Sequence, residues 1–351
     1  MHQSEIQPEV RKLIADGTVV PAHPLALHSD RTLDTQHQRA LTRYYIDAGS
    51  GGLAVGVHAT QFAIREVGLY RPVLELAAET AAHWTRRPLA LVAGLAGPTR
   101  QAVAEARTAR GIGYHAGLLS LAAMKSAGED EIVEHCTAVA REIPLVGFYL
   151  QPAVGGVALS ANFWRRFAEI DNVIAIKIAP FNRYRTLDVL RGVAAAKALD
   201  RITLYTGNDD HILLDLTLPF DLRDAGVTTR VHIKGGLLGH WSVWTAAAIR
   251  QFERCKAARG KESLPADLLA LDARVTDCNS AFFDVAHDFH GCIAGCHEVL
   301  RRQGLMQGIW CLDPHEGLSP GQIEEIDRVC NEHADLSDDD FVAANLHKWL
   351  A

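Results

Sequence analysis

Short apolar runs recur along the first two thirds of the chain, separated by longer stretches rich in helix-forming residues. The runs predict strands near residues 18–23, 52–57, 88–94, 116–120, 144–150, 173–178, 202–207 and 227–234. Their starts are roughly 30 residues apart, the length of one strand–helix–strand unit. Because the runs are continuously apolar, we expect both faces of each strand to be covered by protein. Stretches such as 99–110 and 187–199 are predicted helices between them.

Eight strand–helix units predict a closed (β/α)₈ TIM barrel of the α/β class. The rival is a doubly wound open sheet, but no glycine-rich dinucleotide motif follows the first strand. Residues 1–245 are therefore the predicted barrel, which would carry the active site. Residues 241–260 are typical of a long helix, and 264–351 of several helices without another strand. We expect residues 246–351 to form a C-terminal helical extension and not an independently folding domain.

Composition places the chain among ordinary globular proteins. Hydrophobic residues make up 48% of its 351 residues and charged residues 22%. The formal net charge of −7 argues against a nucleic-acid partner. No apolar run reaches the roughly 18 residues of a membrane span, and the first residues lack the apolar segment of a signal peptide. With an odd number of cysteines, seven, we expect a reduced, cytoplasmic protein.

Lys177 stands inside an otherwise apolar run, VIAIKIA at residues 173–179, in the sixth predicted strand. Catalytic groups of a TIM barrel come from the C-terminal ends of its strands. Burial disfavours the charged ammonium and lowers its pKa, which suits nucleophilic attack on a carbonyl carbon. The alternative is a lysine whose ammonium simply extends from the strand end into water.

Several segments resemble those of a known family, in the same order. They are VGVHATQF (55–62), AGLAGPTRQAVAEARTARGIGYHAGLLS (93–120), YLQPAVGG (149–156), VIAIKIA (173–179) and LYTGNDD (204–210). The chain resembles the dihydrodipicolinate synthase/N-acetylneuraminate lyase family of class I aldolases from about residue 18 to about residue 245. The resemblance implies that Lys177 forms an imine with a carbonyl substrate. It also implies a homodimer or homotetramer that acts on a small molecule, without a metal or an organic cofactor.

Tyr149 opens the fifth-strand motif, and the resemblance implies that its hydroxyl relays protons to and from the imine. A phenol at a strand end is suited to such transfers. The alternative is an aromatic side chain that fills the top layer of the barrel, with its hydroxyl bonded locally.

The sequence departs from the family where substrate carboxylates are normally held. The family's strand-two turn supplies two hydroxyl residues and a glycine, and here these places hold Val57, His58 and Ala59, followed by Thr60. A frequent arginine of the fifth-strand motif is replaced by Val154, and the acid after the imine lysine by Ile178. The tyrosines that usually follow strand four are replaced by LAAMKS (121–126). We therefore expect pyruvate to bind poorly.

Other polar residues at strand ends are candidates for binding substrate. His58 could contact an anion or transfer protons, and Thr60 lies in the same turn. Asn208 and Asp209 follow the seventh strand and could contact substrate hydroxyls. The alternative for these four residues is a structural role in turns and helix caps.

Lys234 ends the eighth predicted strand, beside Gly235 and Gly236. Because alternate strands contribute to one layer of a barrel, Lys234 is expected near Lys177, where it would lower the lysine's pKa or bind an anion. The glycines could present backbone N–H groups to a phosphate. A solvated surface lysine is the alternative.

The segment HDFHGCIAGCH (287–297) gathers histidines and cysteines, but their spacing matches neither standard zinc pattern, so we predict no metal site. The favoured function is a lyase or aldolase that acts on a 2-oxo acid or an aldehyde-like carbonyl compound through an imine on Lys177. One alternative is a ligand-sensing barrel without turnover. Another is a phosphate-sugar enzyme that uses Lys234 and the adjacent glycines.

Overall fold

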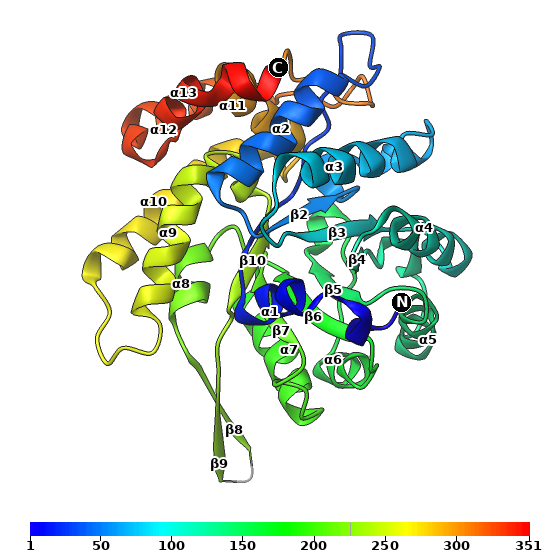
Figure 1. The fold of residues 1–351 in the computed structure, drawn as a ribbon. Helices are drawn as coiled ribbons and strands as arrows, with labels where there is room; N and C mark the ends of the chain where they lie inside the picture. Colours follow the sequence, from blue (N-terminus) through cyan, green and yellow to red (C-terminus); the bar gives the residue numbers. More distant parts are fainter. Residues whose placement is uncertain (225) are drawn as a thin grey trace.

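The computed structural model describes residues 1–224 and 226–351. Eight parallel strands form a TIM barrel, which confirms the predicted fold class (Figure 1). They are β1 (Val19–Pro21), β2 (Gly52–Val55), β3 (Ala90–Leu95), β4 (Ala116–Leu119), β5 (Leu145–Leu150), β6 (Val173–Ala179), β7 (Thr203–Thr206) and β10 (Gly235–Leu238). They pair in the order β1-β10-β7-β6-β5-β4-β3-β2. A parallel bridge between Ala22 and Ala54 joins the two ends of this order and closes the ring.

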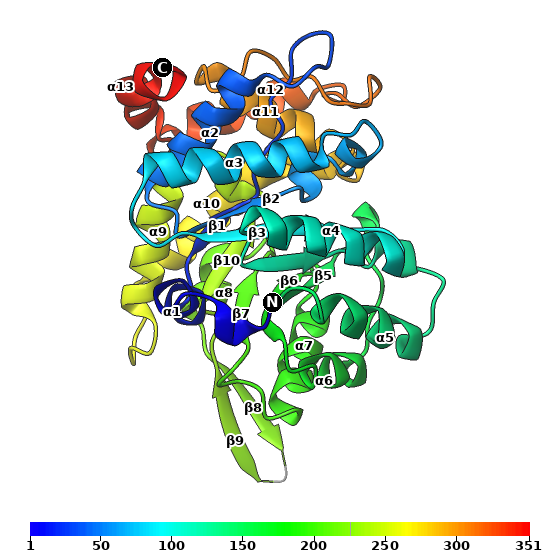
Figure 2. The same ribbon diagram turned by 45° about the vertical axis from the view of Figure 1, so that its right-hand side comes forward.

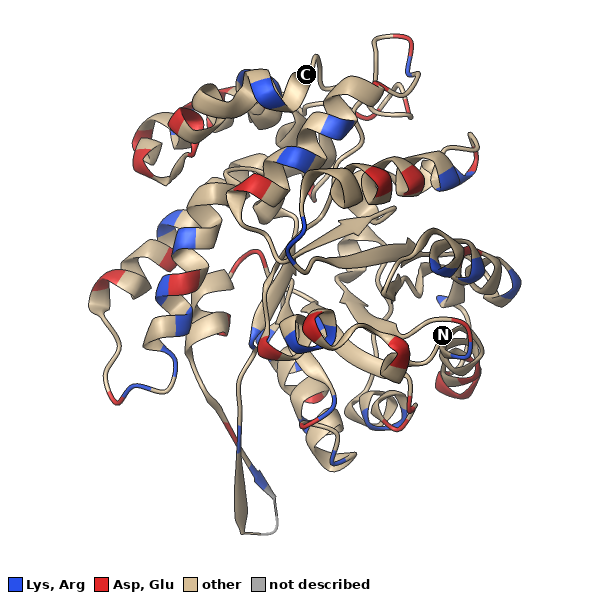
Figure 3. Ribbon diagram, in the orientation of Figure 1, with Lys and Arg blue, Asp and Glu red and all other residues tan. Residues whose placement is uncertain are grey.

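Helices between the strands form the outer layer, and local sequence fixes their ends. They are α2 (Thr35–Ala48), α3 (Tyr70–Trp84), α4 (Thr99–Ile112), α5 (Glu129–Ala140), α6 (Ala161–Ala168), α7 (Arg183–Ala195), α8 (Ile212–Thr217) and α9 (Thr245–Ala258). Asp34 caps α2 by accepting the backbone N–H of His37, and Gly49 ends it in a left-handed conformation. Charged residues of both signs lie on this outer layer (Figure 3).

The N-terminal helix α1 (Pro8–Asp16) lies against the N-terminal ends of the barrel strands (Figure 2). Val10 and Ile14 pack with inward-facing residues of the barrel, such as Val92 and Ile174. The hydroxyl of Tyr205 donates to the carbonyl oxygen of Ile14 at 2.9 Å. This end of the barrel is therefore filled by protein.

The prediction for the eighth barrel strand was wrong. Residues 227–231 form β9 (Val227–Val231), which pairs antiparallel with β8 (Phe220–Asp224) in a hairpin that projects from the barrel (Figures 1 and 2). The true eighth strand is β10, whose sequence GGLL lacks the β-branched residues typical of strands. Its glycines are required by close packing. A Cβ at Gly235 would lie 2.6 Å from the backbone nitrogen of Thr18, and one at Gly236 2.5 Å from the Trp241 ring.

The C-terminal extension consists of α10 (Ala266–Phe282), α11 (Cys292–Arg302), α12 (Gln322–Glu332) and α13 (Asp339–Leu350). Because α9 follows β10 as the eighth helix of the barrel, the extension begins after α9 and not at the predicted boundary of 245/246. Helix α10 packs against α8, and α13 packs against α2. Barrel and extension share one hydrophobic core. No helix within the described residues is long and apolar enough to cross a membrane.

Candidate active site

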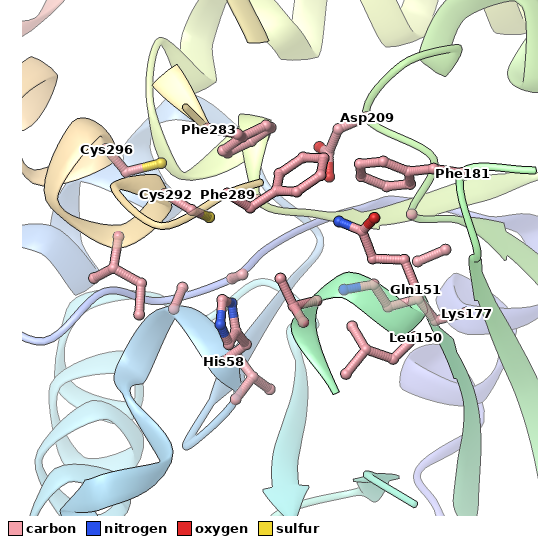
Figure 4. A pocket seen from close by; sticks show the side chains of 18 of the residues that line it. His58, Leu150, Gln151, Lys177, Phe181, Asp209, Phe283, Phe289, Cys292 and Cys296 are labelled. Atoms are coloured by element: carbon pink, nitrogen blue, oxygen red, sulfur yellow. The ribbon is translucent and has the colours of Figure 1, made fainter. Parts of the chain in front are cut away.

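A pocket lies at the C-terminal ends of the barrel strands, between them and the C-terminal extension (Figure 4). The barrel contributes residues that lie within or just after β1, β2, β5, β6, β7 and β10. The extension contributes residues of α11 and of the segment between α10 and α11. Most of the lining is apolar, and Lys177, Asp209, Gln151 and two histidines are its polar members.

Lys177 projects into this pocket from β6. Its neighbours in register are Phe148 on β5 and Tyr205 on β7. The ammonium nitrogen lies 4.4 Å from the centre of the Phe148 ring, and a Cβ at Gly207 would be 2.6 Å from the lysine Cε. Burial lowers the pKa of Lys177, whereas the Asp209 carboxylate raises it. The amine is therefore closer to its nucleophilic free-base form at neutral pH than an exposed lysine would be.

Asp209 follows β7 and is buried in the pocket wall near Lys177 (Figure 4). One carboxylate oxygen accepts the backbone N–H of His240 at 3.0 Å, and Asn279 donates to its backbone carbonyl at 2.6 Å. Burial raises the pKa of Asp209, and the His240 N–H and Lys177 partly oppose that rise. The pocket thus joins a lysine with a lowered pKa to a carboxyl group with a raised pKa, an arrangement typical of acid–base chemistry.

His58 also lines the pocket, in the turn after β2. Burial and, to a smaller extent, the positive charge of Lys177 together lower the pKa of His58 to about 4. The imidazole is therefore neutral near pH 7 and cannot offer a positive charge to a carboxylate. Val57, Ala59 and Val154, which replace the family's polar groups, line the same pocket.

The structure places the side chains of Thr60 and Asn208, two predicted substrate-binding residues, outside the pocket lining. The Thr60 hydroxyl donates to the carbonyl of His23 at 2.7 Å and accepts the backbone N–H of Gly56 at 2.9 Å, so it holds the turn together. The Asn208 side chain donates to Asp215 at 2.9 Å and accepts the backbone N–H of Phe181 at 3.1 Å. Both side chains are buried and support the pocket from behind.

The structure places Tyr149, the predicted proton relay, outside the residues that line the pocket. Side chains alternate along a strand, and Phe148 faces Lys177, so Tyr149 points outward toward α6. Its hydroxyl donates to the carbonyl of Leu159 and accepts the N–H of Leu159, both at 3.2 Å. Its ring lies 5.2 Å from that of Trp164. Tyr149 is thus part of the packing between the barrel and its outer helices.

Lys234 and Gly235 do not belong to the site either. Lys234 precedes β10 and is exposed, with its ammonium 3.4 Å from the carbonyl of Ala15 at the end of α1, at the filled end of the barrel. Burial, and not a second ammonium, lowers the Lys177 pKa. The backbone of Gly235 is packed against Thr18 and Tyr205, so it has no room for a phosphate.

Sequence reasoning missed the contribution of the extension. Phe283, Phe289, Cys292, Cys296 and His297 line the pocket, and the last four belong to the cysteine–histidine segment 287–297. Within the described residues, the group of metal-binding side chains that lies close enough together is Asp277, Glu332 and His333. Arg328 already pairs with Asp277 and Glu332. A local signal for the pocket role was the density of phenylalanine and cysteine between residues 281 and 297.

Known proteins share both the sequence pattern and the fold. The Dihydrodipicolinate synthetase family matches residues 17–235. The 4-hydroxy-tetrahydrodipicolinate synthase of Desulforudis audaxviator is 27% identical over 229 residues, which cover 63% of this chain and 71% of that protein. The dihydrodipicolinate synthase structure from Aquifex aeolicus superposes with a TM-score of 0.73 at 16% identity, covering 92% of this chain and 99% of that one. The N-acetylneuraminate lyase structure from Fusobacterium nucleatum superposes with a TM-score of 0.71 at 18% identity, covering 91% of this chain and 99% of that one. The chain therefore belongs to the dihydrodipicolinate synthetase family, whose members are lyases and synthases of the class I aldolase type.

Proposed function

We propose that this protein is a class I aldolase or lyase in which Lys177 forms an imine with the carbonyl carbon of its substrate. The observation that carries the proposal is Lys177 in an apolar pocket at the C-terminal end of β6, with Asp209 nearby. Family membership supports it, because the family's imine lysine occupies the matching motif.

The chemistry begins when the free amine of Lys177 adds to the carbonyl carbon and gives a carbinolamine. Protonation of the carbinolamine hydroxyl allows water to leave and the imine to form. The protonated imine then accepts the electron pair of a bond broken at the adjacent carbon, which yields an enamine. The enamine carbon then takes up a proton, or adds to a second carbonyl compound, which regenerates the imine. Hydrolysis of this imine releases the product and restores the amine of Lys177.

Asp209 is the group that we assign to these proton transfers, because Tyr149 faces away from the pocket. A carboxyl group whose pKa is raised toward neutrality can both donate and accept protons there. Gln151, at the end of β5, lies beside Lys177 in the pocket and can orient the departing or attacking water (Figure 4).

The structure does not favour the alternative of a phosphate-sugar enzyme, because Lys234 and Gly235, the residues on which it depended, lie away from the pocket. The ligand-sensing alternative shares the pocket with our proposal and differs from it in turnover. A sensor that binds its carbonyl ligand without chemistry would form no reducible adduct on Lys177.

Borohydride trapping tests the proposal. The protein is incubated with small aldehydes and ketones and then with borohydride, and adducts are assigned by peptide mass spectrometry. We expect the peptide containing Lys177 to be labelled preferentially, and Lys177→Met to abolish that labelling. Lys234→Met is the matched control, since this exposed lysine should leave the rate and its pH dependence unchanged. Labelling that persists at full rate in Lys177→Met would refute the proposal.

A further inference from the structure

The roof of the pocket is built by the segment between α10 and α11. Asp284 fixes this segment: it accepts the N–H of Gly291 at 2.9 Å and is bonded to His287 at 2.6 Å and to the hydroxyl of Ser319. The backbone N–H of Phe289 also donates to the carbonyl of Asp284, at 3.0 Å. Phe289 is therefore held in one position above the pocket.

Two aromatic side chains in strained conformations meet at this roof. Phe289 has a φ of 68° and Phe181, which follows β6, has a φ of 49°. Bulky residues rarely adopt this left-handed region, and such strain persists where the surroundings enforce it, often at ligand sites. The two rings lie edge to face with their centres 5.8 Å apart, and both line the pocket. Phe148 and Phe283 add further aromatic surface to the same lining.

The pocket offers no fixed positive charge to a carboxylate. Among the described residues that line it there is no arginine, and Lys177 is its one lysine. Burial lowers the pKa of His58 and of His297 to about 4, so both imidazoles are neutral near pH 7. Once Lys177 becomes an imine, no other lysine or arginine remains among the described lining residues to bind a carboxylate, and Asp209 would repel a substrate anion whenever it is ionised. An uncharged substrate fits this lining and a 2-oxo acid does not.

His297 supplies one polar group to the apolar part of the pocket. It is fully buried on α11, and the backbone carbonyl of Ile309 lies near its ring, but within the described residues neither ring nitrogen makes a hydrogen bond of good geometry. A buried polar group without a partner is unfavourable, so a ligand that supplied one would gain affinity.

On the basis of the imine function proposed above, we propose that the pocket takes an uncharged aldehyde or ketone that carries an aromatic ring and a saturated carbon next to the carbonyl group. Benzaldehydes lack that carbon, so they can form the imine on Lys177 but not the enamine, and they serve below as probes of imine formation only. The ring of the substrate would pack against Phe181 and Phe289, and a hydroxyl or similar polar group on that ring would bind His297. The family's carboxylate-binding residues are replaced by Val57, His58 and Ala59 because this substrate carries no carboxylate at that position.

The test compares borohydride labelling by benzaldehyde, by 3- and 4-hydroxybenzaldehyde and by pyruvate. Because these probes differ in intrinsic reactivity, labelling of Lys177 is divided by labelling of exposed Lys12 in the same sample. Burying an aromatic ring should give the aromatic aldehydes at least a tenfold advantage over pyruvate in this ratio. An equal or higher ratio for pyruvate would overturn the inference while leaving the imine function standing.

If no probe labels Lys177 more than Lys12, the proposed imine function is wrong. Calorimetric measurement of 3- and 4-hydroxybenzyl alcohol binding then tests separately whether the pocket binds an aromatic ring. Saturable binding that Phe289→Ala weakens would still support the aromatic assignment, and absence of binding would overturn it. Phe289→Ala should also reduce the aromatic advantage about tenfold in the labelling experiment. Val285→Ala is the matched control, because Val285 lies on the same segment but is 46% exposed and outside the pocket.

The proposed hydrogen bond from His297 to the ligand is tested by comparing how well hydroxybenzaldehydes and benzaldehyde label Lys177. In the wild type, one of the two hydroxybenzaldehydes should label Lys177 about tenfold better than benzaldehyde, after the same normalisation. His297→Leu should bring this ratio close to one, whereas His290→Leu, at an exposed position of the same region, should not change it. If neither hydroxyl isomer is favoured in the wild type, the assignment of His297 is wrong.

Discussion

Replacing Tyr149 by phenylalanine tests whether its hydroxyl has the structural role seen here or the proton-relay role that the family resemblance implies. The change removes one hydroxyl, which makes two hydrogen bonds of 3.2 Å to the backbone of Leu159. Leu159 is buried, so its N–H and carbonyl lose their partner without gaining water. Unpaired buried groups cost about 1–3 kcal/mol, and because both bonds are long we expect a loss of about 1–2 kcal/mol.

The expected result is a destabilised protein with an intact active site. Equilibrium urea unfolding measures the loss of stability, and the rate of borohydride labelling of Lys177 by benzaldehyde measures imine formation. We expect that rate to stay within about twofold of the wild type, because Tyr149 does not line the pocket and its hydroxyl bonds to Leu159, whereas loss of a proton relay would cost about 10²–10⁴-fold. Tyr205→Phe is the matched control, because it deletes a buried hydroxyl bonded to Ile14 at the filled end of the barrel. A fall of two orders of magnitude in Tyr149→Phe alone, with the fold preserved, would refute our placement of this side chain.

Two further substitutions test the site and the fold. In Asp209→Asn the carboxylate that raises the Lys177 pKa is gone, so the pH above which labelling becomes fast should move about one unit lower, while turnover of a confirmed substrate should fall about 10²-fold. A labelling profile that moves to higher pH would contradict this sign. Gly236→Ala places a methyl group against Trp241 and should destabilise β10 by about 1–3 kcal/mol in urea unfolding. A urea-unfolding midpoint equal to that of the wild type would show that β10 can shift to make room for the added methyl group, and would contradict this prediction.

The sequence predicted seven barrel strands because each is an apolar run between helical stretches, a pattern that persists whatever the details of packing. It failed at β10, where close contact with Thr18, Tyr205 and Trp241 requires glycine and overrides strand propensity. The β-branched run at 227–231 does form a strand, but in the projecting hairpin. Local propensity identified a strand there and could not identify its partner.

The sequence pointed to the site through one residue whose charge is unusual for its apolar surroundings. Lys177 stood out because a charge inside an apolar strand is costly, whereas the inward or outward direction of Tyr149 depended on strand register. An irregularity in the pairing of β5 with β6, between Leu145 and Val146, helps to set that register and leaves no mark in the sequence. The density of phenylalanine and cysteine around Phe289 and His297 was visible in the sequence, but the place of these residues in the site could not be predicted, for another reason. That place depends on where a segment about a hundred residues further along the chain folds back, and no local periodicity records that.

The extension changes the chemistry of the barrel as well as its shape. In an open, wet site, Lys177 and Asp209 would exist as an ion pair, and the protonated amine could not attack a carbonyl. Burial beneath the extension lowers the lysine pKa and raises the aspartate pKa, so the two groups move toward a neutral amine facing a protonated acid. That pair is the one imine formation needs, a nucleophile and a proton donor for the departing water. The apolar roof that selects an uncharged substrate would therefore also activate the lysine, so an opened roof should weaken selectivity and imine formation together.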